Sequence, residues 1–356
     1  MIHLLSDGEV VAGRYVIDGY VGEGGMQEVY LARDRAIGRA VALKIPKNNS
    51  ATKRFQQSAA VSARVTHPNV AKTFDYVEDG DRQVLIEEFI QGQDLRARLL
   101  SSFLYLDCHL AAHVFHHLAK GLAAVHKEGV IHRDLKPSNI MLSSDYDLAT
   151  IKITDFGIAK MAEAEIQDNV QDTTLASRTV FGAIPYMAPE VIRNKRNIGT
   201  AADVWSLGAI LFHILTGELP FGEGLEAVER ILASKTPEKP AILHVGAQFR
   251  QLTDDLWTLI LACLRTDPNE RPSALELVGA CNSLCYSREP RTAGKIGTFK
   301  PKNGKWGFIE CATFKEPTFF HEDSYWGSTP QVGQRVSFAR FPGTPCHRAH
   351  PVLLLR

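Results

Sequence analysis

The feature that most constrains the fold is a change of residue periodicity along the chain. Residues 10–46 alternate apolar and polar side chains between glycines, which predicts the strands and hairpins of a small antiparallel sheet. From Leu106 onward the apolar residues follow helical spacing, and this pattern ends near Cys285. Between these regions, Val84 to Ile90 is typical of a buried strand, and Gln91 to Asp94 interrupts it. We therefore expect a β-rich lobe followed by a helical lobe.

A third pattern follows the helical region. Ser287 to Arg291 is typical of a short linker, and short strand-like segments rich in aromatic residues come after it. Residues 291–356 contain 10 Lys and Arg against 4 Asp and Glu, whereas the whole chain has 40 of each sign. The composition therefore predicts a basic, all-β unit at 293–356, joined to the helical lobe by a linker at 286–292.

A glycine-rich segment begins at Gly22 and lies between two strand patterns. Glycines let a backbone fold closely over phosphates and offer its N–H groups, but a glycine-rich hairpin alone is more often only a turn. Its significance comes from the segments that follow it. In chain order these are Val41-Ala42-Leu43-Lys44, His132-Arg133-Asp134-Leu135-Lys136-Pro137-Ser138-Asn139, Asp155-Phe156-Gly157 and Ala188-Pro189-Glu190.

In this order and spacing, the segments resemble a protein kinase, specifically the bacterial eukaryotic-like Ser/Thr kinases, over about residues 10–285. The resemblance implies an α+β, bilobal protein-kinase fold with an N-lobe at about 10–90 and a C-lobe at about 91–285. It also implies transfer of the γ-phosphate of ATP to Ser or Thr hydroxyls of protein substrates, with Mg²⁺ as the cofactor.

The resemblance assigns a role to each polar residue of these segments. Lys44 would neutralise the α- and β-phosphates, while Asn139 and Asp155 would hold the magnesium ions. Asp134 would accept the proton of the attacking hydroxyl, and Lys136 would face the transferring γ-phosphate. Further nucleotide contacts would come from Gly22, Gly24, Val29, Ala42, Glu88 and Ile90, with residues 88–90 as the hinge that pairs with adenine.

Other family positions concern order rather than chemistry. Asp203 would brace the catalytic loop, and Glu190 would form a buried ion pair with Arg271. Arg133, beside Asp134, resembles kinases whose activation loop is ordered by a phosphate. The candidate phosphorylation sites are Thr173, Thr174, Ser177 and Thr179. For any single one of them, a solvated loop hydroxyl is an equally good interpretation.

Three positions depart from the kinase pattern. The third glycine of the phosphate loop is Gln27, which should stiffen or lift the phosphate cover. The helix glutamate that pairs with the nucleotide lysine falls at Ser58, and residues 51–70 contain no Asp or Glu. Ala183 replaces a threonine whose hydroxyl usually links the catalytic aspartate and lysine.

An acidic residue occupies a usually apolar position, because Glu87 directly precedes the hinge. We hypothesise that its carboxylate reaches Lys44 as a substitute partner. The departures fall on positioning groups, whereas the groups that contact metal, phosphate and nucleophile remain, so we expect an active kinase. The alternatives are a pseudokinase, which is an ATP-binding regulatory scaffold without turnover, and a nucleic-acid-binding protein with a vestigial kinase fold.

The C-terminal unit resembles a cold-shock domain, a five-stranded OB-type barrel, in the segments Gly294–Phe299, Gly304–Ile309, Phe319–His321 and Val332–Phe338. The resemblance implies binding of single-stranded RNA or DNA, with bases stacked on aromatic rings and phosphates near lysines. The residues implied are Trp306, Phe308, Phe319, His321, Lys300 and Lys305. Thr298 and Glu322 stand where the family commonly has aromatic residues. A barrel whose aromatics only fill its core, or one that binds protein or regulates the kinase, is therefore the alternative.

The remaining signals predict no further site. His109, His113 and His117 share a helical face, but the resemblance places them on a packed helix, so we predict no metal there. Six cysteines are too few for a disulfide scaffold, and no signal-peptide pattern follows Met1. The most apolar stretch, Val204 to Leu215, is too short to span a bilayer. We expect a cytoplasmic protein without a membrane partner.

Overall fold

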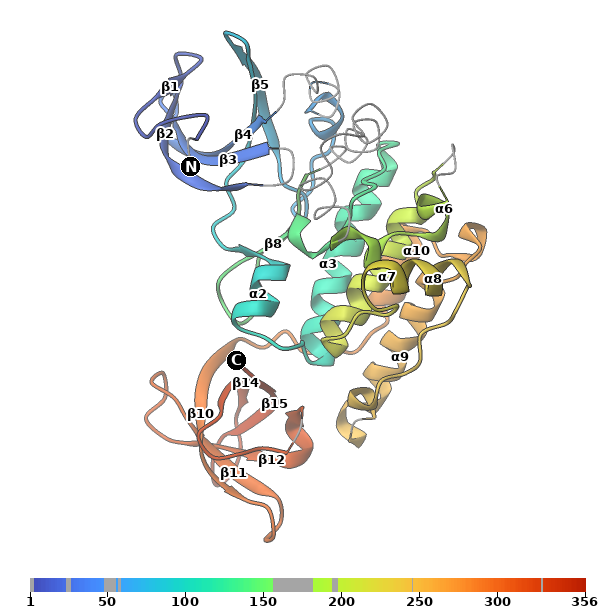
Figure 1. Ribbon diagram of the computed structural model, residues 1–356. Coiled ribbons are helices and arrows are strands. Elements are labelled where there is room, and N and C mark those ends of the chain that lie inside the picture. Colours follow the sequence, from blue (N-terminus) through green and yellow to red (C-terminus); the bar gives the residue numbers. More distant parts are fainter. Residues whose placement is uncertain are drawn as a thin grey trace.

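The computed structural model describes residues 3–23, 27–47, 56, 59–155, 182–193, 198–244, 246–327 and 329–356. Three parts follow one another along the chain: a β-rich N-lobe, a helical C-lobe and a β-barrel (Figure 1). They correspond in order to the three periodicities of the sequence. Among the helices of these residues, none is both long and apolar enough to cross a membrane.

The N-lobe is an antiparallel sheet in the strand order β1-β2-β3-β4-β6-β5. Alternation along β4 divides its side chains between two faces. Val41, Leu43 and Ile45 enter the apolar core of the lobe, so Ala42 and Lys44 lie on the opposite face. The strands are β1 (Val10–Val11), β2 (Tyr15–Glu23), β3 (Gln27–Asp34), β4 (Arg39–Pro46), β5 (Thr73–Asp79) and β6 (Arg82–Glu88).

The C-lobe follows the predicted interruption of the chain. Asp94 accepts a hydrogen bond from the N–H of Ala97 and so caps the first helix. The helices are α2 (Leu95–Ser101), α3 (Cys108–Lys127), α6 (Pro189–Ile192), α7 (Ala201–Thr216), α8 (Gly224–Leu232), α9 (Ala247–Cys263) and α10 (Ala274–Asn282). The short strands β7 (Gln93–Asp94), β8 (Ile140–Leu142) and β9 (Ile151–Ile153) form a small antiparallel sheet beside them.

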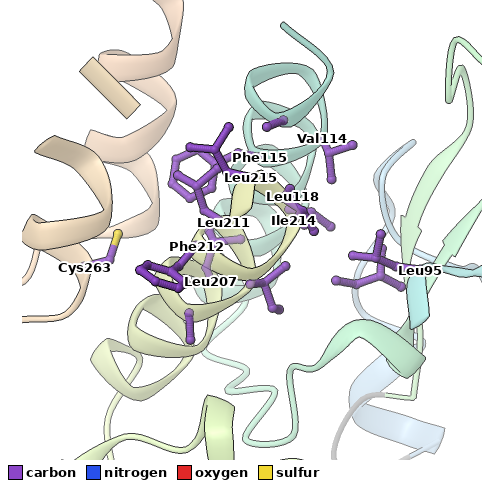
Figure 2. Close-up of a cluster of buried hydrophobic side chains, with 14 of the residues drawn as sticks. Leu95, Val114, Phe115, Leu118, Leu207, Leu211, Phe212, Ile214, Leu215 and Cys263 are labelled. Atoms are coloured by element: carbon purple, nitrogen blue, oxygen red, sulfur yellow. The ribbon is translucent and has the colours of Figure 1, made fainter. Parts of the chain in front are cut away.

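Helices α3 and α7 form the centre of the C-lobe. Figure 2 shows Phe115 and Leu118 of α3 beside Leu211 and Leu215 of α7, and all four are fully buried. Gly217 directly follows helix α7, and its φ of 77° lies in the left-handed region that glycine adopts without strain. This apolar packing holds the helix that carries Asp203 against the loop before β8.

The C-terminal strands close into a barrel in the order β10-β11-β12-β15-β14, with β14 pairing back to β10. Its core contains Ile296, Ile309, Phe320 and Phe338. The closed, five-stranded arrangement is compatible with the expected OB-type barrel. The strands are β10 (Arg291–Lys300), β11 (Trp306–Glu310), β12 (Thr318–His321), β13 (Tyr325–Trp326), β14 (Arg335–Phe341) and β15 (Arg348–Leu354).

The barrel packs on the end of the C-lobe that lies away from the N-lobe (Figure 1). Trp326 and Leu353 belong to the same buried apolar cluster as the C-lobe helices. Phe249 of α9 contacts Trp326 and His350, each at a ring-centroid distance of 5.2 Å. Strand β10 begins at Arg291, inside the segment expected to be a linker. The barrel is therefore fixed to the C-lobe by side chains as well as by the chain connection.

Candidate active site

Lys44 lies on the inner face of the N-lobe sheet between two carboxylates. Its Nζ is 2.6 Å from Oε2 of Glu87 and 2.8 Å from Oδ1 of Asp155. Lys44 and Glu87 are both buried, with side-chain exposures of 7% and 5%. The substitute contact that the sequence suggested is therefore present. Two carboxylates therefore hold the ammonium group in place.

Lys44, Glu87 and Asp155 shift one another's pKa values. Burial lowers the pKa of Lys44, but Asp155 and Glu87 together raise it above its ordinary value, so the lysine is charged. Burial raises the pKa of Asp155, yet Lys44 and hydrogen bonds outweigh it and leave that pKa below its ordinary value. For Glu87, burial outweighs the attraction of Lys44, and its pKa is raised. Asp155 is thus kept ionised.

Gln27 points inward. Its side chain is 7% exposed, and its Nε2 donates a hydrogen bond of 2.8 Å to Oδ1 of Asp155, the same oxygen that Lys44 contacts. Sequence reasoning expected Gln27 to stiffen or lift the phosphate cover and did not foresee this contact. One feature of the sequence indicates such a contact. Gln27 has an amide group, which can donate to a carboxylate, at a position that is glycine in the kinase pattern.

The loop before β8 is braced from α7. The carboxylate of Asp203 accepts hydrogen bonds of 2.8 Å from the backbone N–H groups of His132 and Arg133, and lies 2.9 Å from Nε2 of His126. Asp203 is almost fully buried. Arg133 has a φ of 67°, a strained conformation that needs such support. The bracing contact expected of Asp203 is therefore confirmed.

Asp134 is contacted by two residues that follow it. Nζ of Lys136 lies 2.7 Å from Oδ2 of Asp134. Nδ2 of Asn139 donates to the backbone oxygen of Asp134 at 2.8 Å and to Oδ2 at 3.1 Å. Because Lys136 reaches the aspartate directly, the hydroxyl that is missing at Ala183 is not needed to join them. Ala183 itself is buried in the wall of a cleft that also contains Asp134.

A short hydrogen-bond network connects this loop to Asp155. The backbone N–H of Thr154 donates to the oxygen of Asn139 at 2.9 Å, and Nε2 of His132 lies 2.9 Å from the oxygen of Thr154. Asp155 has a φ of 61°, in the left-handed region that non-glycine residues rarely adopt. The backbone is thus bent where it presents this carboxylate to Lys44.

The expected adenine-binding positions line the same inner face. Val29 pairs with Lys44 across β3 and β4, and Gly22 pairs with Val29 across β2 and β3. Ala42 and Ile90 are each 8% exposed. In the hinge, the N–H of Glu88 donates to the oxygen of Lys72, and its carboxylate contacts Lys152. Any adenine contacts of the hinge therefore fall to its other backbone groups.

The lower lobe contains the second expected ion pair. Nη1 and Nη2 of Arg271 lie 2.7 and 2.9 Å from the two carboxylate oxygens of Glu190, and both side chains are buried. The guanidinium also donates to backbone oxygens of Arg265 and Ala201. The bidentate pair joins α6 to the segment before α10, and the additional bond to the oxygen of Ala201 connects both to the start of α7.

Comparison with known proteins agrees with this geometry. The family described as "Protein kinase domain" matches residues 15–280. This chain belongs to the protein kinase family. The serine/threonine-protein kinase pkn2 of Myxococcus xanthus is 32% identical over 301 residues, which cover 83% of this chain and 35% of that protein. Serine/threonine-protein kinase PrkC of Bacillus subtilis is 30% identical over 276 residues, which cover 76% of this chain and 40% of that protein.

A third relative gives the same picture. The probable serine/threonine-protein kinase PknB of Lactococcus lactis is 32% identical over 260 residues, which cover 71% of this kinase and 39% of that protein. The chain thus spans between a third and a half of the length of these three curated relatives. The bilobal kinase fold expected from the sequence is confirmed, because family, lobes and motif geometry agree.

Several predicted positions of this kinase lie outside the residues that the structure describes. They are Gly24, Ser58 and the candidate phosphorylation sites Thr173, Thr174, Ser177 and Thr179. Phe156 and Gly157, which follow Asp155 in its motif, also lie outside them.

On the barrel, the expected aromatic residues form a cluster separate from the core. Trp306 pairs with His321, and Phe308 pairs with Phe319 across β11 and β12. The rings of Trp306, Phe308 and Phe319 contact one another, with centroids 5.7 to 6.1 Å apart, and all three are half-buried. Nζ of Lys300 lies 4.6 Å from the centre of the Trp306 ring. These aromatics therefore do not serve as the barrel core, which other residues fill.

The neighbouring charges of the cluster are mixed. Exposed Lys305 forms an ion pair of 3.0 Å with Glu322, and Nδ1 of His321 lies 3.2 Å from Oδ2 of Asp323. Glu322 stands where a further aromatic was expected in the family pattern. The positive charge of Lys305 is therefore partly neutralised within the protein.

Two histidines of α3 contact the segment before the barrel. Nδ1 of His109 accepts a hydrogen bond from the N–H of Ser287, and Nδ1 of His116 lies 2.8 Å from the hydroxyl of Tyr286. Burial lowers the pKa of His109, His113 and His116 to about 4. In the described part of the chain, no three His, Cys, Asp or Glu residues are placed to hold a metal ion together.

Proposed function

We propose that this protein is an active Ser/Thr protein kinase that transfers the γ-phosphate of ATP to hydroxyls of protein substrates. The observation that carries the proposal is the hydrogen-bonded link between two sets of side chains. The first set is Lys44 with Asp155, and the second is Asp134 with Lys136. Asn139 connects the two sets, because it donates to Asp134 and its backbone oxygen accepts from Thr154, the residue before Asp155. Phosphoryl transfer needs this combination of cations and carboxylates.

The donor set of the described residues fits Mg²⁺. Asp155 is held ionised. Asn139 uses its Nδ2 atom on Asp134, and its Oδ1 atom, which accepts a long hydrogen bond of 3.4 Å from the hydroxyl of Ser138, is the oxygen that it would offer to a metal. Carboxylate and amide oxygens are the ligands that Mg²⁺ prefers. When bound, the metal would neutralise charge on the β- and γ-phosphates.

The protein's own groups divide the reaction between them. Asp134 orients the substrate hydroxyl and receives its proton as the new bond from oxygen to phosphorus forms and the bond to the departing ADP breaks. Lys136, 2.7 Å from Asp134, places its charge beside the transferring phosphate. Lys44 holds the phosphates that remain on the nucleotide. A lysine two residues after the catalytic aspartate, as Lys136 is after Asp134, resembles the Ser/Thr-specific kinases. The proposed acceptors are therefore Ser and Thr hydroxyls, not the aromatic hydroxyl of Tyr.

A transfer assay tests this proposal against the pseudokinase alternative. We would incubate the full chain with γ-labelled ATP, Mg²⁺ and a generic basic protein substrate, beside Asp134→Asn. We expect label on both proteins, reduced at least 100-fold in the variant. Label on the chain itself is expected within Thr173, Thr174, Ser177 and Thr179. Saturable ATP binding without transfer would instead establish a pseudokinase, and absence of ATP binding a vestigial kinase fold.

We also propose that the barrel binds single-stranded RNA or DNA. Support comes from the half-buried cluster of Trp306, Phe308 and Phe319, with Lys300 over one ring, on a surface that the core does not need. Each exposed ring face offers a base about 1–3 kcal/mol of stacking energy. Because Lys305 already contacts Glu322 and has less charge to offer to phosphates, we expect a moderate affinity with a shallow dependence on salt.

Fluorescence anisotropy with a labelled 12-nucleotide single strand tests this second proposal. The variant Trp306→Ala should weaken binding at least fivefold. Phe314→Ala is the matched control, because Phe314 is also half-buried in the barrel but contacts Arg340 instead of the cluster. Equal affinity of the two variants, or no binding by the full chain, would favour a barrel that binds protein or regulates the kinase.

The proposed division of the chain is a kinase domain at 10–285, a linker at 286–292 and a cold-shock-like domain at 293–356. We further propose a cytoplasmic location. Its support is that none of the six cysteines forms a disulfide in the structure, as in a reducing compartment.

A further inference from the structure

The contact between Lys44 and Glu87 follows from the register of two neighbouring strands. In the pairing of β4 with β6, Ala42 lies opposite Glu87, and Lys44 lies opposite Leu85. Residues two apart on a strand share a face, so Lys44 and Glu87 are diagonal neighbours on the inner face of the sheet. The ladder of backbone hydrogen bonds therefore places both side chains, and the 2.6 Å contact needs no movement of another element.

The other carboxylate near Lys44 has a different task. Asp155 receives hydrogen bonds from both Lys44 and Gln27 on its Oδ1 atom, and its carboxylate is also the proposed metal ligand. A metal and an ammonium group compete for the same oxygens. Glu87 offers Lys44 a second carboxylate that the proposed metal site does not use. It is 3% exposed, so water competes little for it.

We propose that Glu87 is the positioning residue for Lys44 and supplies, from inside the sheet, the carboxylate that the kinase pattern takes from a helix. The inference rests on the proposed function, since Lys44 is assigned to the phosphates of ATP. It also explains how the chain tolerates a segment, residues 51–70, that contains no Asp or Glu. Lys44 then has a carboxylate partner in a different part of the chain, on β6.

The position of Glu87 has a consequence for the pocket. It directly precedes the hinge residues 88–90, and it lies opposite Ala42, which is one of the expected adenine contacts. The carboxylate that holds the phosphate-binding lysine is thus also part of the back of the adenine pocket. An inhibitor that extends an apolar group past Ala42 would have to bury it against this ion pair, which is unfavourable.

The test compares two ligands on the full chain. Calorimetry would measure the affinity of Mg-ATP and of adenosine, which lacks phosphates, for the wild type and Glu87→Gln. We expect Mg-ATP binding to weaken about tenfold, which corresponds to about 1.4 kcal/mol, with adenosine affinity changed less than about twofold. Glu9→Gln is the matched control, because it removes a more exposed carboxylate that pairs with Arg82 of the same sheet.

The outcomes separate this inference from the proposed function. Equal weakening of both ligands, or no change in either, would overturn it. Should Glu87→Gln not fold, Glu87→Asp replaces it, because aspartate keeps the charge but is one carbon shorter. Mg-ATP affinity must then fall more than adenosine affinity, by a smaller factor than in Glu87→Gln. If Glu87→Gln weakens Mg-ATP binding selectively but the wild type transfers no label, the kinase proposal fails while the role of Glu87 stands.

Discussion

Arg291, at the start of β10, donates hydrogen bonds of 2.5 and 2.9 Å to the carboxylate of Asp107, the residue before α3. The two side chains are 4% and 0% exposed. The same carboxylate accepts hydrogen bonds from the N–H groups of His109 and Leu110 and so caps α3. One buried carboxylate therefore joins the barrel to the central helix of the C-lobe.

The first prediction concerns this ion pair. Removing one partner of a buried pair leaves an uncompensated charge, so Arg291→Ala should lower the free energy of unfolding by about 3 kcal/mol. Denaturant titration of the full chain measures it. Arg230→Ala, which removes an exposed pair with Glu226, should cost less than about 0.5 kcal/mol. Similar losses in both variants would show that the buried pair contributes nothing particular.

The same pair has a pH dependence of known sign. Burial raises the pKa of Asp107, but Arg291 more than compensates and leaves it below its ordinary value. Because the folded-state pKa is lower than the unfolded one, the contribution is fully present above about pH 4 and is lost as the pH falls through the folded value. In Arg291→Ala, the stability lost on acidification below pH 4 should therefore be smaller than in the wild type.

A second prediction concerns the buried histidines. Burial lowers the pKa of His109, His113, His116 and His213 to about 4. Between pH 6.5 and 4 the unfolded chain binds protons that the folded chain does not, so stability falls as the pH is lowered through this window. Each such proton contributes a slope of up to about 1.4 kcal/mol per pH unit.

Unfolding free energies at pH 7, 6 and 5 check this expectation. In His113→Gln the unfolding free energy should fall less steeply with decreasing pH, because the variant lacks one of the groups that bind a proton on unfolding. The slope should decrease by up to about 1.4 kcal/mol per pH unit, the contribution of one proton. His244→Gln is the control, since His244 is exposed and outside the C-lobe core. A wild-type stability that is flat between pH 7 and 5 would contradict the prediction.

A third prediction concerns Asp203, which holds the catalytic loop without touching the proposed substrates. Asp203→Asn exchanges an acceptor oxygen for a donor, so the N–H groups of His132 and Arg133 lose part of their support. We expect kcat to fall at least tenfold while the KM for ATP changes less than about threefold, because misplacement of Asp134 affects the reaction more than nucleotide binding. A loss confined to KM would be inconsistent with this role.

A fourth prediction concerns Gln27. Its amide donates to Oδ1 of Asp155, an oxygen that the proposed metal site requires. Removing the amide frees this oxygen, so Gln27→Ala should lower the Mg²⁺ concentration for half-maximal ATP binding by about threefold. Mg²⁺ titrations at constant ATP measure this value. A higher Mg²⁺ requirement in the variant would mean that Gln27 helps to orient Asp155 for the metal.

Much of the kinase site could be predicted from the sequence because its parts are local. The loop from His132 to Asn139 contains its own contacts, and the alternation along β4 already places Lys44 on the face opposite the apolar core. The contact of Glu87 with Lys44 could be predicted for the same reason, since the register of two adjacent strands is enough to bring the two side chains together. Trp306 and Phe308 are two residues apart on β11, so strand alternation likewise places them on one face, where their rings contact each other.

The sequence by itself thus determined the family, the order of the lobes and the residue types of the site, because short-range periodicity and motif spacing specify them. Only the tertiary structure decided that Gln27 turns inward to Asp155 and that the barrel is fixed to the C-lobe through Asp107 and Arg291. These contacts join residues 128 and 184 positions apart. Their partners are selected by burial and charge in the folded chain, where an unpaired carboxylate would be costly, and no local pattern records that selection.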